Sequence, residues 1–166
     1  MTTDLLHAGL IPDPYLDRDE EELAWIGRCD WRYRTWFDAA PAGPGERVDL
    51  VCEGLDAVAR VELNGIHIAS TANMHRSYRF GVGTALRPGD NELVITLTAP
   101  VTAAEAMSER LGERPRALDV RFNAIRKMAC ACGWDWGPAL PTSGIWRPVG
   151  IERWSRARTA PVRPLS

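Results

Sequence analysis

Residues 57–68, Ala-Val-Ala-Arg-Val-Glu-Leu-Asn-Gly-Ile-His-Ile, indicate the fold class of this 166-residue chain. From Ala59 to Leu63 every second residue is apolar, which is the period of a half-buried β-strand. Asn64-Gly65 follows without a gap, and both residues of a two-residue hairpin turn adopt a positive φ. The stretch therefore predicts a β-hairpin whose first strand runs from Ala57 to Leu63.

Other segments show the same alternation of β-forming residues, separated by short turns rich in Gly, Pro, Asn and Asp. They predict strands at Asp30 to Phe37, Arg47 to Glu53, Ser77 to Val82, Glu92 to Thr98 and Ile145 to Trp154, the last with an edge or bulge at Arg147-Pro148. Many short strands joined by short turns are typical of sandwiches and jelly rolls. We therefore predict an all-β fold, an antiparallel β-sandwich or jelly roll with one short helix, Val101 to Leu111, and a long functional loop.

The chain divides into three predicted parts. Residues 1–24 are expected to be irregular because Pro12 and Pro14 restrict the backbone, with a loop or one helical turn at 19–22. Residues 25–155 are expected to form the sandwich. Residues 156–166 are expected to be a linker stub.

Composition excludes several classes of protein. Hydrophobic residues make up 45% and charged residues 25%, as in an average globular protein. No apolar run is long enough to span a membrane, and the N-terminus lacks the positive region of a signal peptide, so we expect a cytoplasmic location and no membrane partner. Scattered arginines and a net charge of −2 argue against nucleic-acid binding. Four cysteines without a CxxC pair argue against a metal site, and we expect no cofactor.

The long loop over 112–144 is the place to look for chemistry, because long loops in compact domains are often functional. Within it an amide, a guanidinium, the ammonium of Lys127 and a carboxylate lie near two indole rings, which are the groups a sugar site uses for hydroxyl pairs and for the C–H face. The candidate sugar-binding residues are Asn123, Arg126, Trp134 and Asp135.

A structural alternative explains the same residues. An ion pair of Asp135 with Arg126 or Lys127 could hold the loop, with Trp134 and Trp136 as core side chains. Neither a Ser-His-Asp triad nor a pair of catalytic carboxylates is evident, so we predict no catalytic residue.

Several motifs resemble one known family along nearly the whole chain. They are Asp4-Leu5-Leu6, Gly9 to Tyr15, Trp25-Ile26-Gly27, Asp30 to Arg34, Glu53-Gly54-Leu55-Asp56, Leu63-Asn64-Gly65, Asn73-Met74-His75-Arg76, Ile125-Arg126-Lys127, Trp134 to Pro138 and Gly144 to Val149. The chain resembles the N-terminal sugar-binding, galactose-binding-like jelly-roll domain of glycoside hydrolase family 2, and within that family it is most similar to the β-mannosidases.

The resemblance implies a part of a longer retaining enzyme that removes terminal β-mannose with two glutamates on a TIM barrel. One loop of the sandwich would reach the active-site pocket, and here that loop is 122–138. Asp135 would accept hydrogen bonds from mannose hydroxyls, Trp134 would shape the pocket wall, and Asn123 and Arg126 would line the pocket or fix the loop. Relatives begin with a further strand, so we expect an uncovered sandwich edge.

Three functions remain open at this point. The chain is a non-catalytic fragment or truncated form of a β-mannosidase, inactive alone because the barrel is missing. Alternatively, it is a stand-alone carbohydrate-binding module. The third possibility is a docking subunit for a separately encoded barrel.

Overall fold

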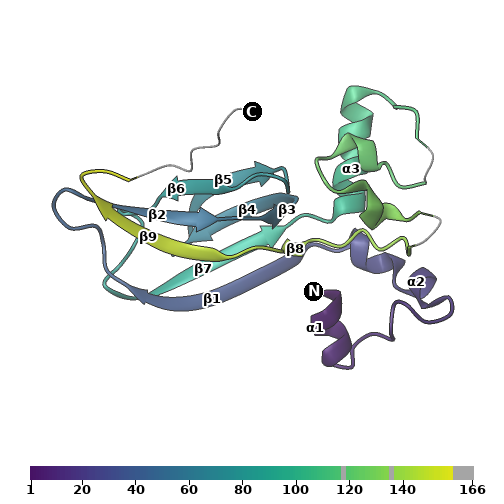
Figure 1. The fold of residues 1–166 in the computed structure, drawn as a ribbon, viewed down its shortest axis with the longest axis horizontal. Helices are drawn as coiled ribbons and strands as arrows, with labels where there is room; N and C mark the ends of the chain where they lie inside the picture. Colours follow the sequence, from purple (N-terminus) through teal and green to yellow (C-terminus); the bar gives the residue numbers. More distant parts are fainter. Residues whose placement is uncertain (117–118, 135–136, 159–166) are drawn as a thin grey trace, which may run out of the picture.

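Two antiparallel sheets face each other in the structure, a computed structural model that describes residues 1–116, 119–134 and 137–158 (Figure 1). The strands are β1 (Trp31–Ala39), β2 (Glu46–Cys52), β3 (Leu55–Asp56), β4 (Val58–Leu63), β5 (Ile66–Ala72), β6 (Tyr78–Gly81), β7 (Gly89–Leu97), β8 (Gly144–Ile145) and β9 (Val149–Ser155). One sheet has the order β1-β7-β4-β5 and the other β6-β2-β9, with β3-β8 as a short pair. The predicted antiparallel sandwich is confirmed.

The hairpin forms where the sequence predicts it. Asn64 and Gly65 have φ values of 53° and 78°, and the turn joins β4 to β5. The amide of Asn64 donates to Asn91 Oδ1 at 2.8 Å, and Asn91 is fully buried. Three further bonds join the Asn91 amide to backbone carbonyls of the neighbouring turns. These bonds replace the water that a buried amide loses, so the turn is held to the sheet.

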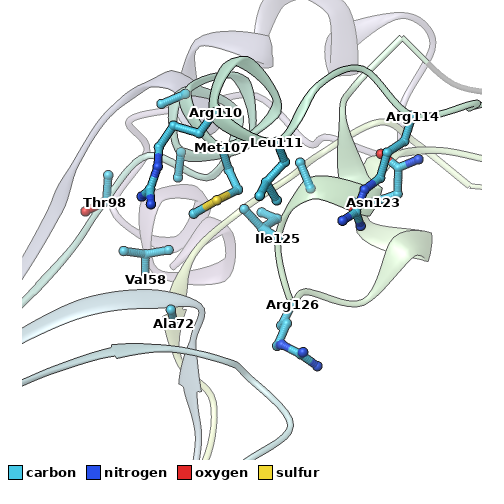
Figure 2. A pocket seen from close by; sticks show the side chains of 13 residues that line it. Val58, Ala72, Thr98, Met107, Arg110, Leu111, Arg114, Asn123, Ile125 and Arg126 are labelled. Atoms are coloured by element: carbon cyan, nitrogen blue, oxygen red, sulfur yellow. The ribbon is translucent and has the colours of Figure 1, made fainter.

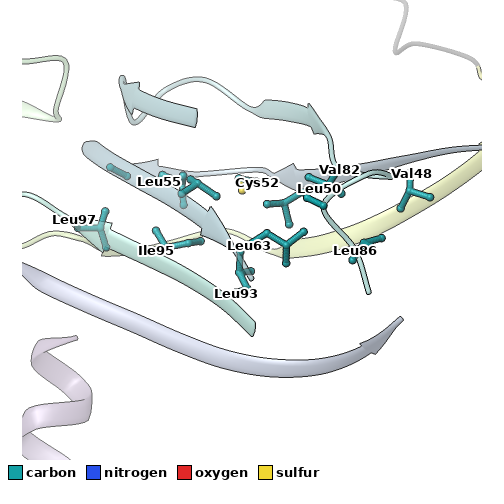
Figure 3. Packing of buried hydrophobic residues seen from close by; sticks show 13 residues of the cluster. Val48, Leu50, Cys52, Leu55, Leu63, Val82, Leu86, Leu93, Ile95 and Leu97 are labelled. Atoms are coloured by element: carbon teal, nitrogen blue, oxygen red, sulfur yellow. The ribbon is translucent and has the colours of Figure 1, made fainter. Parts of the chain in front are cut away.

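The core lies between the two sheets (Figure 3). Leu50 and Val82 come from the three-stranded side, and Leu63 and Ile95 meet them from β4 and β7; all four are at most 1% exposed. The alternation read from the sequence places these residues on inward faces because successive side chains of a strand point to opposite sides.

The predicted closing strand from Ile145 to Trp154 is two strands in the structure. β8 ends at Ile145, and β9 begins after Pro148, which has no N–H to donate to a ladder. The Pro148 carbonyl still accepts a bond from Glu53 N at 2.9 Å. The irregularity was therefore predicted at the right place, but as an edge or bulge of one continuous strand.

Helices and loops gather at one end of the sandwich (Figure 1). They are α1 (Thr2–His7), α2 (Asp19–Glu22), η1 (Ala24–Arg28), α3 (Pro100–Leu111), η2 (Phe122–Ala124) and η3 (Ala129–Cys132). The helix predicted from Val101 is confirmed as α3. The prediction of a single helix is wrong, and residues 1–24 are not irregular throughout, because α1 closes its turn with Leu5 N donating to Met1 O before the first proline. The helical turn that was one of two alternatives for 19–22 is present as α2. No helix of the described residues is long and apolar enough to cross a membrane.

The N-terminal segment packs against this end through its own apolar cluster. Ile11, Leu23 and Ile26 are buried together. A Cβ on Gly27 would lie 2.8 Å from Pro141 Cγ, so the Trp-Ile-Gly motif needs glycine for this close approach. Arg28 forms a two-bond ion pair with Glu105 of α3, at 2.9 and 3.2 Å.

One side of the sandwich is open. β1 and β9 are each the last strand of a sheet, and an apolar hollow of about 210 Å³ lies between them, lined among others by Tyr33, Leu93, Ile95 and Val149.

Candidate functional site

A buried ion pair fixes the long loop to the sandwich. Lys127 Nζ donates to Asp56 Oδ2, although the residues are 71 positions apart in the chain. Their side chains are only 2% and 11% exposed. Lys127 is the sole lysine of the chain, beside 19 arginines. A compact ammonium on a flexible stem can reach into a buried site where a planar guanidinium would need more room and more acceptors.

Burial sets the electrostatics of this pair. It raises the pKa of the Asp56 carboxyl, because a buried carboxylate loses its water. The charge of Lys127 and its hydrogen bond act in the opposite direction, as does the more remote His75. Lys127 therefore favours the ionised form of Asp56 against the effect of burial, and the two residues form one unit.

A second contact holds the loop beside the end of β5. Met74 N donates to the Arg126 carbonyl at 3.0 Å, and Met128 N points at Met74 Sδ at 3.0 Å. Met74 is only 1% exposed. Asn73 shapes this segment, since its Oδ1 accepts from His75 N at 2.9 Å. The Asn-Met-His-Arg motif thus holds the Ile-Arg-Lys motif in place through the contacts of Met74.

Asn123 is held by bonds inside the loop. Its Nδ2 donates to the Pro115 carbonyl at 2.8 Å, and its own carbonyl accepts from Arg114 Nη1 at 3.3 Å. Asn123 and Arg126 line the same hollow beneath α3, but Trp134 is not among the residues that line it (Figure 2). The structure therefore brings together two of the four predicted site residues and places Trp134 elsewhere on the loop.

Backbone hydrogen bonds join the two ends of the short segment from Trp134 to Gly137. Trp134 and Gly137 exchange two backbone hydrogen bonds, each 3.2 Å long. Gly133 has a φ of 94°, and a Cβ there would lie 3.1 Å from Ala139 Cβ, so glycine is required by conformation and by space. Ala139 N donates to Glu20 of α2 at 3.1 Å, which joins the loop to the N-terminal segment.

Trp134 is 46% exposed. The alternative that Trp134 is a core side chain is therefore wrong. Asp135 and Trp136 lie outside the described residues, and so does any ion pair between Asp135 and Arg126. The structure gives Lys127 a different partner, Asp56, from the one considered on sequence.

Sequence reasoning did not assign Asp56 or Met74. Asp56 ends the Glu-Gly-Leu-Asp motif, where a carboxylate next to apolar residues signals a buried charge that needs a partner. The single lysine among many arginines, Lys127, was the corresponding sign of a buried cation that could pair with this carboxylate. Gly54 of the same motif is explained by packing, because a Cβ on it would lie 2.5 Å from the indole nitrogen of Trp146.

Comparison with known proteins identifies the family. The family described as "Glycosyl hydrolase 2 galactose-binding domain-like" matches residues 1–147. The chain belongs to this family. It is the galactose-binding-like N-terminal domain of β-mannosidase-like proteins of glycoside hydrolase family 2, as the resemblance of its motifs predicted.

Named relatives agree with this assignment. The chain is 40% identical over 152 residues to "Beta-mannosidase B" of Thermothelomyces thermophilus and 36% identical over 161 residues to "Beta-mannosidase" of Capra hircus. These alignments cover 90% and 91% of the chain but 18% of each relative. The chain thus spans about a fifth of the length of these relatives.

Solved structures show the same fold. The β-D-mannosidase of Dictyoglomus thermophilum matches 98% of the chain and 21% of its own length, with a TM-score of 0.82 and 36% identity. The exo-chitosanase CsxA of Amycolatopsis orientalis matches with a TM-score of 0.66 at 21% identity over 92% of the chain, and it supports the fold alone.

Proposed function

We propose that this domain is the non-catalytic part of a β-mannosidase-like glycoside hydrolase and that its segment 122–138 contributes to recognition of the terminal β-mannose. One observation carries the proposal. The buried Asp56–Lys127 pair and the Met74 contacts fix a loop that carries a half-exposed tryptophan. A ligand-binding group on a fixed loop loses less entropy on binding than one on a mobile loop.

The roles within the loop follow from chemistry. Asp135 accepts hydrogen bonds from adjacent hydroxyls of the sugar, because an ionised carboxylate is a strong acceptor with two oxygens. Trp134 covers the apolar C–H face of the ring. Asn123 and the Arg126 backbone fix the loop through their bonds to Pro115 and Met74.

The partners are a terminal β-mannoside and a catalytic TIM barrel in the same or another chain. We expect no hydrolysis by the 166-residue chain alone, since no residue in it is assigned as acid or nucleophile. The naming of the relatives as β-mannosidases supports the choice of sugar. A cytoplasmic location stays a prediction.

A chimera tests the role of the loop. The matching fifth of the Dictyoglomus thermophilum enzyme is replaced by this chain, and kcat/KM is measured on an aryl β-mannoside. We expect Asp135→Ala to lower kcat/KM by roughly 10- to 100-fold, the value of a charge-assisted hydrogen bond. The matched control is Asp38→Ala, which removes an exposed carboxylate from β1.

Trp134→Ala is compared in the same chimera with Trp36→Ala, which removes an indole that is 61% exposed on β1. We expect only Trp134→Ala to raise KM, by about fivefold. Equal effects of the two aspartate variants and of the two tryptophan variants would contradict the assignment of the loop.

The alternative of a stand-alone carbohydrate-binding module predicts a different result. Titration of the 166-residue chain with mannose would then produce saturable heat without any barrel. Sequencing of the DNA on both sides of the reading frame separates the remaining possibilities, because a barrel in frame, a barrel encoded separately and unrelated neighbours each indicate one of them.

A further inference from the structure

A hollow lies beside α3, between this helix, residues 123–126 and the strands β4 and β5. Its volume is about 650 Å³, within the range of small-molecule pockets. α3 and η2 form its roof, and the ends of β4 and β5 lie below (Figure 2). Apolar side chains make up the interior, namely Val58, Met107, Leu111 and Ile125.

Three arginines and no acidic residue line this hollow. Arg110 reaches down from α3 toward Thr98 and Val58, and Arg126 extends from the loop below η2 (Figure 2). Arg114 donates to the Asn123 carbonyl. Eight of the other fifteen described arginines form an ion pair with a carboxylate, for example Arg28 with Glu105 and Arg153 with Glu46. Within residues 1–116, 119–134 and 137–158, no ion pair involves Arg110 or Arg126.

The residues that line the hollow indicate which class of ligand it can bind. It has no aromatic ring to cover a sugar face and no carboxylate to accept from hydroxyls. Leu111 is 55% exposed, so a bound apolar body would cover a large side chain that now faces water. The hollow therefore fits a molecule with an apolar body and one negative head.

We propose that the hollow binds a small amphipathic carboxylate, with its aliphatic body against Met107, Leu111 and Ile125 and its carboxylate on Arg110. The hydroxyl of Thr98 provides a further donor beside Arg110, and Arg126 adds positive potential. The site does not use Trp134 or Asp135, but Asn123 and Arg126 in its lining belong to the segment 122–138 that the proposed function assigns to mannose recognition.

Octanoate is the probe for this site. The ¹⁵N-labelled 166-residue chain is titrated, and amide shifts report the position and the dissociation constant. We expect saturable shifts in α3 and at 123–126. Arg110→Gln weakens octanoate about fivefold, the value of one exposed ion pair. Arg32→Gln, which removes an exposed arginine from β1, leaves affinity unchanged.

Two further ligands and one variant distinguish the contribution of charge to the affinity from the contribution of apolar contact. Octan-1-ol should bind about fivefold more weakly than octanoate, and octylammonium more weakly again, because they lose or reverse the charge. Leu111→Asn, at an exposed position that tolerates a polar side chain, should weaken octanoate about threefold through lost apolar contact. The proposal is overturned if octylammonium binds as tightly as octanoate, if Arg110→Gln matches Arg32→Gln, or if the shifts do not saturate or fall outside the hollow.

Discussion

Replacing Lys127 by Met tests the physical basis of the loop anchor. Met keeps most of the apolar stem of the lysine and removes only the charge. Asp56, 11% exposed, would then be a buried carboxylate without its ion-pair partner. Breaking a buried pair of this kind by removing one partner costs about 3–5 kcal/mol. An exposed pair would cost only about 0–1 kcal/mol, so the size of the loss tells the two cases apart.

Urea unfolding measures the loss at two pH values. Burial already raises the pKa of Asp56, and loss of Lys127 raises it further. A carboxyl whose folded pKa lies above its unfolded value destabilises the fold as pH rises through that interval. The loss of stability in Lys127→Met should therefore be larger at about pH 7.5 than at about pH 4.5, because the lower pH favours protonation of Asp56 and so reduces the uncompensated charge.

The double variant is the matched control. Asp56→Leu with Lys127→Met replaces both charges by apolar groups, and it should recover most of the stability lost in Lys127→Met alone. A loss below about 1 kcal/mol in Lys127→Met, or a double variant as unstable as the single one, would refute the reasoning. Loss of the same size at both pH values would also refute it.

Three other changes test the packing of the motifs. Gly54→Ala should cost about 2–4 kcal/mol in urea unfolding because its Cβ would lie 2.5 Å from the Trp146 indole, whereas Gly150→Ala, with nothing within 4 Å, should cost less than about 1 kcal/mol. Asn91→Ala should cost about 3 kcal/mol, since it removes a fully buried amide with several bonds. Burial raises the pKa of Cys52 to about 11, so at neutral pH a thiol reagent should label the native chain only at the exposed thiols, Cys29 and Cys130, and all four cysteines after unfolding. Labelling of Cys52 at the rate of Cys29 would contradict this.

The sequence predicted which segment of the chain holds the candidate site. It did not predict which residues contact one another there. The loop stood out because it was long, lacked regular strand signals and held charged and aromatic residues together. The partner of Lys127 was missed because Asp56 is 71 positions away in the chain, and only the fold brings the two together. Asn123 and Arg126 share a hollow with α3 for the same reason, since a helix is placed by its packing and not by its sequence spacing.

The strands and the β4–β5 hairpin could be predicted from local sequence. Alternation of apolar residues in Ala59 to Leu63 and the Asn64-Gly65 turn are local signals, because strand period and turn conformation depend on adjacent residues. Only the folded chain shows that Asp56 accepts a hydrogen bond from Lys127 and that Gly54 must lack a side chain beside Trp146. These contacts join residues far apart in the chain, and their free energy exists only after the sandwich has formed.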